Sequence, residues 1–162
     1  FIGPPSDKEL DSYLADKMSE PGNGKIICGG TTALIAEREL GKSLVIDMDS
    51  ITPDTPPIAY MEGFDLVTEG VLTLGKALEY IKKYNESCYE NAIEINDYNG
   101  STLLTRLLTE HCTNINFYVG KAVNPAHQNP NFPVGFNIKQ KIIRDLVNEL
   151  RKAGKEITVK YL

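Results

Sequence analysis

The stretch from Lys25 to Leu40 constrains this chain most, because an apolar run ends there at two glycines and continues directly into a helical pattern. Lys-Ile-Ile-Cys is typical of a short buried strand, and Gly29 and Gly30 interrupt it. Apolar residues then recur at helical spacing as far as Gly41, a predicted left-handed helix cap. A strand that turns tightly into a helix is a half-unit of α/β proteins, and the turn is suited to binding an anion.

The rest of the chain continues this alternation of helix and strand. The patterns predict helices that include residues 10–18, 71–81, 101–111 and 138–152, and strands at 44–46, 58–60, 64–67, 114–119 and 157–161. Residues 84–99 look like a variable insertion, and 122–133 like a long loop. We expect one α/β domain over residues 1–162, with a layered, mainly parallel, Rossmann-like sheet flanked by helices. The sequence does not determine the order of the strands in that sheet.

The start of the chain predicts an edge strand. Phe1 and Ile2 are apolar, and Pro4 and Pro5 cannot donate to a sheet ladder, so the segment should leave the edge of the sheet through a turn. The first residue is not methionine, which suggests a fragment of a longer chain.

Composition narrows the function classes. The net charge of −5 argues against nucleic acid as a partner, and the absence of a long apolar run argues against a membrane. The three cysteines, Cys28, Cys88 and Cys112, are odd in number and lack metal-ligand spacing, so we expect reduced thiols and a cytoplasmic location.

The glycine turn is the first candidate site. Gly29 and Gly30 leave backbone N–H groups free to point at one spot, and the helix amino terminus adds partial positive charge. Thr31 and Thr32 add hydroxyl donors, so a phosphate or carboxylate could bind here. Alternatively, the glycines only permit close packing and Thr31 caps the helix.

Residues 65–70 form the second candidate site. Asp65 is expected near the carboxyl end of a strand, and Thr68 and Glu69 stand at the start of a helix. Asp65 or Glu69 could orient a ligand hydroxyl or act as an acid or base. The alternative is a helix cap in which the dipole favours Glu69.

The third candidate is the loop that contains Asn124, His127, Gln128 and Asn129. It follows a strand at the sheet edge where α/β proteins bind ligands, although Asn-Pro pairs are also ordinary turn formers. Cys28 lies beside the glycine turn, but without an evident base a buried, inert thiol is the better interpretation. Two histidines are too few for a histidine-rich metal site.

Several short stretches, in order over nearly the whole chain, share one resemblance. They are residues 3–5 (GPP) with Asp7 and Asp11, 27–33 (ICGGTTA) with 38–41 (RELG), 56–60 (PPIAY), 65–74 (DLVTEGVLTL), 116–120 (NFYVG) and 124–130 (NPAHQNP). Together they resemble the carboxy-terminal region of bacterial SpoIIE-family serine/threonine protein phosphatases. In that family a metal-dependent phosphatase domain precedes such a region.

The resemblance implies an accessory role for this chain. The family's phosphatase domain binds divalent metal through aspartates in glycine-flanked motifs, and here Leu66 stands where such a glycine would follow Asp65. We therefore assign no metal and no cofactor to this chain, and expect metal only in a preceding phosphatase domain, which would be its partner.

These observations lead to one hypothesis and two alternatives. The first is a regulatory domain that binds a small anionic, phosphate-containing ligand with the three loops converging on one site. The second is an enzyme acting on a phosphorylated small molecule, with Asp65 or Glu69 as general base. The third is a protein-interaction module, which a large exposed apolar patch would favour.

Overall fold

The computed structural model describes residues 1–22, 24–86, 98–122 and 138–162. The α-helices are α1 (Asp11–Ser19), α2 (Gly30–Leu40), α3 (Val71–Glu86), α4 (Gly100–Arg106) and α5 (Ile138–Lys152). The strands are β1 (Ile26–Cys28), β2 (Val45–Asp47), β3 (Ile58–Tyr60), β4 (Leu66–Thr68), β5 (Asn114–Val119) and β6 (Glu156–Tyr161). The short helical turns are η1 (Lys8–Leu10), η2 (Met48–Ser50) and the π-helical η3 (Leu107–His111), which continues α4.

Local sequence signals explain where these elements begin and end. The Asp7 side chain caps η1 by accepting the Glu9 N–H, and α1 continues from there. Gly41 closes α2 at φ 64° and ψ 28°, the predicted left-handed cap. The predicted bounds of β5 and α5 coincide with those observed.

The strands form a mixed sheet. Its four-stranded part has the order β1-β4-β3-β2, in which β1 and β4 are parallel and β3 is antiparallel to both neighbours. The remaining two strands, β5 and β6, pair in parallel over their full length. The α/β class with a sheet flanked by helices is confirmed, and the Rossmann-like, mainly parallel arrangement stays a prediction.

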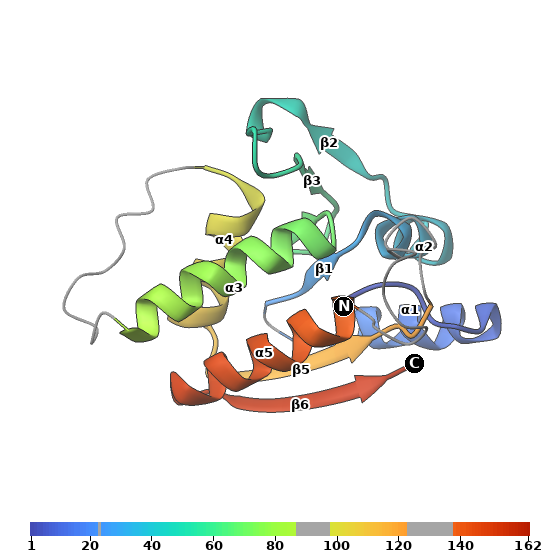
Figure 1. Ribbon diagram of the computed structural model, residues 1–162. Helices are drawn as coiled ribbons and strands as arrows, with labels where there is room; N and C mark the ends of the chain where they lie inside the picture. The colour runs from blue at the N-terminus through green and yellow to red at the C-terminus, as the bar shows by residue number, and fades with distance from the viewer. Residues whose placement is uncertain (23, 87–97, 123–137) are drawn as a thin grey trace, which may run out of the picture.

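The amino-terminal segment joins the two parts of the sheet (Figure 1). Ile2 bridges in parallel to Cys28 of β1 and to Val119 of β5. The Ile2 N–H donates to Tyr118 O at 2.8 Å, and the Cys28 N–H donates to Phe1 O at 2.8 Å. The prediction of an edge strand is wrong, because this segment has a strand on each side and the prolines lie beyond its last bridge.

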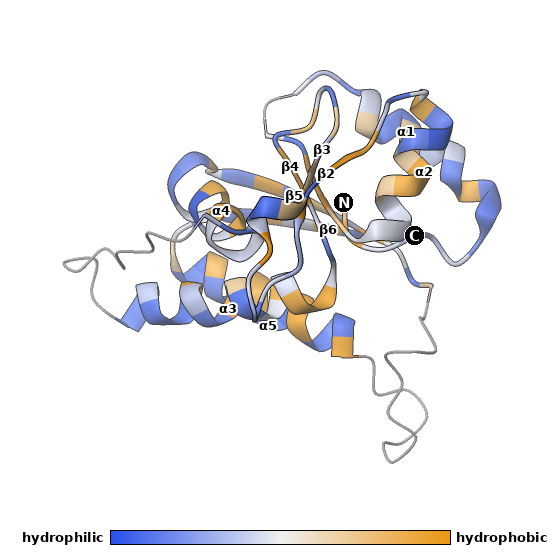
Figure 2. Ribbon diagram, turned by 90° about the horizontal axis from the view of Figure 1, so that it is seen from above, coloured by the Kyte–Doolittle hydropathy of each residue, from blue (hydrophilic) through white to orange (hydrophobic). Residues whose placement is uncertain are grey.

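Two hydrophobic cores lie against the sheet, and each involves different helices. The larger contains side chains of α3, α4 and α5, and the smaller contains Leu14, Met18, Ala33 and Ala36 of α1 and α2. Seen from above, α3, α4 and α5 lie on one side of the strands, and α1 and α2 on the other (Figure 2). Ile27 belongs to the smaller core and Cys28 to the larger, as alternation along β1 requires.

Gly120 lies against the backbone of Gly3 and Pro4, where the amino-terminal segment joins the two parts of the sheet. A Cβ at this position would lie 1.9 Å from Pro4 O and 2.4 Å from Gly3 O. The Gly120 N–H also donates to Ile2 O at 2.9 Å. Only glycine fits here, because the backbone itself is the obstacle.

We therefore predict that Gly120→Ala lowers the free energy of unfolding by about 1–3 kcal/mol or more, as overpacking does. The matched control is Gly75→Ala within α3, where the new Cβ would meet only Ile142 Cδ1 at 3.8 Å. Its higher helix propensity should raise the free energy of unfolding by about 0.5–1 kcal/mol. Urea unfolding of both variants measures this, and equal stabilities would contradict the prediction.

Candidate functional site

The site is the turn between β1 and α2, at the carboxyl end of β1. Gly29 has φ 136° and ψ 123°, a conformation that favours glycine. Its N–H donates to Thr68 O at 2.8 Å, and its carbonyl accepts the Ala33 N–H at 3.0 Å, the first hydrogen bond of α2. The neighbouring loop is close as well, because a Cβ on Gly70 would lie 3.6 Å from Gly29 Cα.

The amino terminus of α2 has no side-chain cap. Gly29 occupies the cap position and makes no such bond, so the alternative that Thr31 caps the helix is wrong. Gly30 and Thr31 are exposed. Within the described ranges, the N–H groups of Gly30, Thr31 and Thr32 show no hydrogen-bond partner. These are the groups that bind anions at helix amino termini.

The next two α-helices along the chain, α3 and α4, contrast with α2. The Glu69 carboxylate accepts the Leu72 N–H of α3 at 3.0 Å. Asn99 forms a capping box at the start of α4, accepting from Ser101 and Thr102. The first turn of α2 is therefore the one of these three that could receive an external anion.

Thr32 adds an unpartnered hydroxyl to this turn. Its side chain is fully buried, and Oγ1 has no hydrogen-bond partner among the residues described. Oγ1 faces the cap position, since a Cβ on Gly29 would lie 3.3 Å from it. A buried polar atom without a partner carries a free-energy cost, which a hydrogen bond to a bound group would offset.

Thr68 and Glu69 lie beside this turn, as the sequence predicts. Thr68 is buried and donates its hydroxyl proton to Glu69 O at 2.7 Å. The Glu69 carboxylate caps α3 through Oε2, which agrees with the capping interpretation. A carboxylate has two acceptor oxygens, so Glu69 keeps the capacity to accept a further hydrogen bond.

Asp65 lies elsewhere, and its expected position is wrong. β4 begins at Leu66, so Asp65 precedes the strand instead of following it. Its Oδ2 accepts the Lys25 N–H at 2.6 Å, at the amino end of β1. Three residues of extended chain, about 10 Å, separate it from Thr68. Asp65 therefore does not belong to the site that the three loops were predicted to form together. The residues of the third loop, Asn124, His127, Gln128 and Asn129, lie outside the described residues.

Lys139 is a candidate that sequence reasoning missed. Its ammonium group donates to Gly120 O at 2.5 Å and to Ala122 O at 2.9 Å, and a Cβ on Gly3 would lie 2.9 Å from Nζ. Burial lowers the pKa of Lys139. No carboxylate of the described segments forms an ion pair with it. In the sequence it is one lysine among several, and only its burial without a counter-ion distinguishes it.

Gly3 lies between Lys139 and the turn. A Cβ on Gly29 would be 3.5 Å from Gly3 N and 3.8 Å from Gly3 Cα. Given standard bond lengths, Lys139 Nζ is therefore within about 10 Å of Gly29 Cα. The ammonium group contributes positive potential to the same edge of the sheet.

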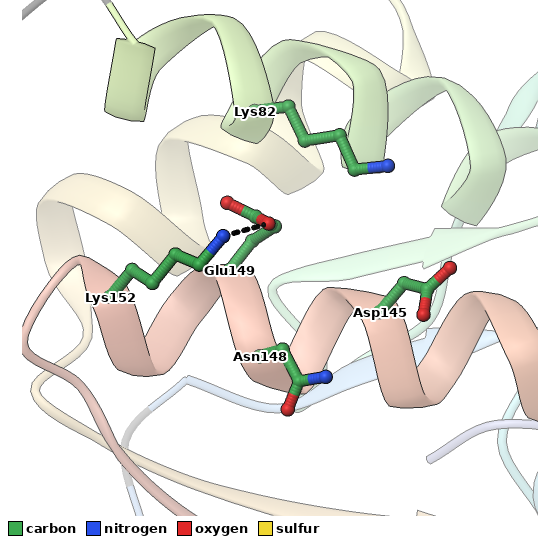
Figure 3. A pocket seen from close by; sticks show the side chains of 5 residues that line it. All are labelled: Lys82, Asp145, Asn148, Glu149 and Lys152. Atoms are coloured by element: carbon green, nitrogen blue, oxygen red, sulfur yellow. Dashed lines mark hydrogen bonds and ion pairs between the residues drawn. The ribbon is translucent and has the colours of Figure 1, made fainter.

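A separate cavity of about 510 Å³ lies between α3 and α5. Lys82 reaches toward it from α3, and the other lining residues, Asp145, Asn148, Glu149 and Lys152, come from α5 (Figure 3). Lys152 binds Glu149 at 2.8 Å, and this hydrogen bond is the main reason that the pKa of Glu149 is lowered. Two ammonium groups face two carboxylates here, so the cavity lacks the net charge that would select an ion.

Metal chemistry and known proteins give no further assignment. Across the described ranges, no group of three His, Cys, Asp or Glu side chains is arranged to hold a metal ion. In the same residues no helix is both long enough and apolar enough to span a bilayer. Comparison with protein-family models, with curated proteins and with solved structures finds no match. The family resemblance and the absence of a cofactor stay predictions.

The reactivity of the Cys28 thiol measures how accessible the carboxyl end of β1 is to reagents in solution. The residue is 3% exposed, and burial raises the pKa of its thiol above the usual value. A raised pKa means that the reactive thiolate is scarce at pH 8 and increases only at more alkaline pH. We predict that iodoacetamide modifies the partly exposed Cys112 before Cys28 and modifies Cys28 only on unfolding. Peptide mapping by mass spectrometry measures both rates, and comparable rates in the folded protein would refute the prediction.

Proposed function

We propose that this chain is a regulatory domain that binds a small anionic, phosphate-containing ligand at the first turn of α2. The observation that carries the proposal is the uncapped helix start beside the buried, unpartnered hydroxyl of Thr32. Backbone N–H groups and the helix dipole both favour negative charge at this position. A Rossmann-like sheet would place its ligand at this edge, beyond the carboxyl ends of its parallel strands.

The charges around the turn narrow the class of ligand. Lys139 supplies positive potential from the Gly3 side, whereas the Glu69 carboxylate adds negative charge from the α3 side. The charge of Lys139 would increase the affinity for a simple anion, and the charge of Glu69 would decrease it. A phosphorylated polyol suits both, because its phosphate can bind the N–H groups while a hydroxyl donates to Glu69.

The regulatory part of the proposal rests on the SpoIIE-family resemblance. In that arrangement a phosphatase domain precedes this chain and is its partner, and ligand binding at the α2 turn changes the activity of the attached enzyme. The free thiols of Cys28 and Cys112 agree with the cytoplasmic location proposed for such a protein.

Two positions weigh against the enzyme alternative. Asp65 is bound to the Lys25 N–H about a strand length from the turn, and Glu69 is already engaged as a helix cap. We therefore favour binding over turnover.

The proposal predicts that a built-in carboxylate competes with the ligand. Thr31→Asp places a negative charge on the exposed second residue of α2 and should raise the free energy of unfolding by about 0.3–1 kcal/mol through the helix dipole. It should also abolish stabilisation by phosphate compounds. The matched control, Thr31→Asn, has the same shape without the charge and should bind as the unmodified protein does.

Thermal unfolding with inorganic phosphate and glucose 6-phosphate measures these effects, with glucose as the uncharged control. A compound at ~100 times its Kd adds about 2.7 kcal/mol to the free energy of unfolding. Glucose 6-phosphate should bind more tightly than phosphate. Stabilisation that persists in Thr31→Asp would place the anion elsewhere, and no stabilisation by either compound would refute the proposal.

Lys139 gives a second, independent prediction. Lys139→Gln removes the ammonium charge and should weaken phosphate binding about two- to tenfold, since a unit charge about 10 Å away is worth about 0.4–1.7 kcal/mol at effective dielectric constants of about 80 to 20. Lys139→Arg keeps the charge and should retain most of the affinity. Binding measured by calorimetry at two salt concentrations should also lose part of its salt dependence in Lys139→Gln. Equal affinity for all three proteins would remove Lys139 from the site.

A further inference from the structure

The outer edge of β2 is an open sheet edge. β2 is last in the order β1-β4-β3-β2, and it pairs only with β3 within the described ranges. The segment from Leu44 to Ser50 contains no lysine, arginine or proline, and its charged residues, Asp47 and Asp49, stand at the last position of β2 and beyond it. The backbone of β2 is therefore accessible to another extended chain.

Large apolar side chains surround this edge. Val45 is 59% exposed and Ile46 is 58% exposed, and successive residues of a strand point to opposite faces. Neither face of β2 is therefore covered by the residues that the structure describes. Met48, Ile51 and Tyr60 are also at least half exposed, so an apolar surface extends into the following turn and onto β3. Exposed apolar side chains that gather along one segment in this way indicate an interaction site.

Hydrogen bonds hold the edge in place. The Glu37 carboxylate accepts the Leu44 N–H at 3.1 Å, just before β2. Asp47 Oδ2 accepts from the Tyr60 hydroxyl at 3.1 Å, and Oδ1 accepts the Asp49 N–H at 3.0 Å, which caps η2. An edge that is ordered before binding loses less conformational entropy when a partner adds to it.

The charges select the kind of partner. Residues 44–54 contain Asp47, Asp49 and Asp54 and no basic residue. In an antiparallel pairing of β2 with a second copy centred on Ile46, Asp47 would lie opposite Val45, and in an in-register parallel pairing it would lie opposite another Asp47. Neither gives the carboxylate a counter-charge, so a strand of a different sequence with a basic residue at that position can pair better than a second copy.

We propose that β2 accepts an extended segment of a different sequence as an added antiparallel strand. The segment carries a basic residue opposite Asp47 and apolar residues opposite Ile46 and Val45, so it reads basic–apolar–apolar. Main-chain hydrogen bonds supply affinity, and the cross-strand pairs supply sequence preference. This surface is separate from the α2 turn and does not depend on the anion site.

The test uses dye-labelled peptides and the folded protein. One peptide carries a central lysine–isoleucine–valine triplet within threonines, and a second carries glutamate in place of lysine. Fluorescence anisotropy should show saturable binding, with the lysine peptide about threefold tighter or more, as expected for opposite against like charge across a strand pair. Amide NMR shifts should be largest at β2.

Two variants locate the site. Ile46→Lys places a protective lysine on the edge and should weaken binding at least tenfold, whereas Leu34→Lys, at a 56% exposed position of α2, should leave binding unchanged. Asp47→Asn keeps the oxygen that caps η2 but removes the charge, so it should abolish the preference for lysine over glutamate.

Several results would overturn the proposal. These are no saturable binding of either peptide, binding unchanged in Ile46→Lys, or a lysine preference that survives Asp47→Asn. Sedimentation of the protein without peptide measures its oligomeric state. A dimer that dissociates in Ile46→Lys would show that the β2 edge binds a second copy of the chain instead. Phosphate stabilisation in Ile46→Lys should stay as in the unmodified protein, so this test and that of the α2 turn fail independently.

Discussion

The hydrogen bonds of Phe1–Gly3 hold the architecture together. In the part of the chain that the structure describes, Ile2 links β1 and β5, because it bridges to both Cys28 and Val119. Its backbone bonds on one side to β1 and on the other to β5, including Gly120 N–H to Ile2 O at 2.9 Å. Buried backbone groups need such partners, so the segment turns two small sheets into one continuous surface that both hydrophobic cores can cover.

The same joint shapes the proposed anion site. Gly3, Gly29 and Gly120 lie close together at one edge of the sheet. A Cβ on Gly120 would clash with the backbone of Pro4, and a Cβ on Gly3 would crowd Lys139 Nζ. Close backbone packing leaves the first N–H groups of α2 uncovered while α3 is capped by Glu69. The proposed anion site therefore consists of the first N–H groups of α2 and the ammonium group of Lys139, which close backbone packing brings to the same edge of the sheet.

The two proposed surfaces use different physical properties of one sheet. The α2 turn lies at the ends of strands, where helix dipoles and unpaired N–H groups favour an anion. The β2 edge lies along a strand, where unpaired backbone and exposed Val45 and Ile46 favour an extended chain. A domain with both could sense a small molecule and contact a protein through separate surfaces.

The sequence by itself determined the elements and part of the site. Periodicity located β5 and α5, and Gly41 marked the end of α2, because these signals depend on local backbone preferences. Tertiary structure alone decided that Phe1 and Ile2 lie inside the sheet, that Asp65 precedes its strand, and that Lys139 is half-buried near the turn. Those facts depend on hydrogen bonds and packing between residues far apart in the chain, which local patterns do not encode.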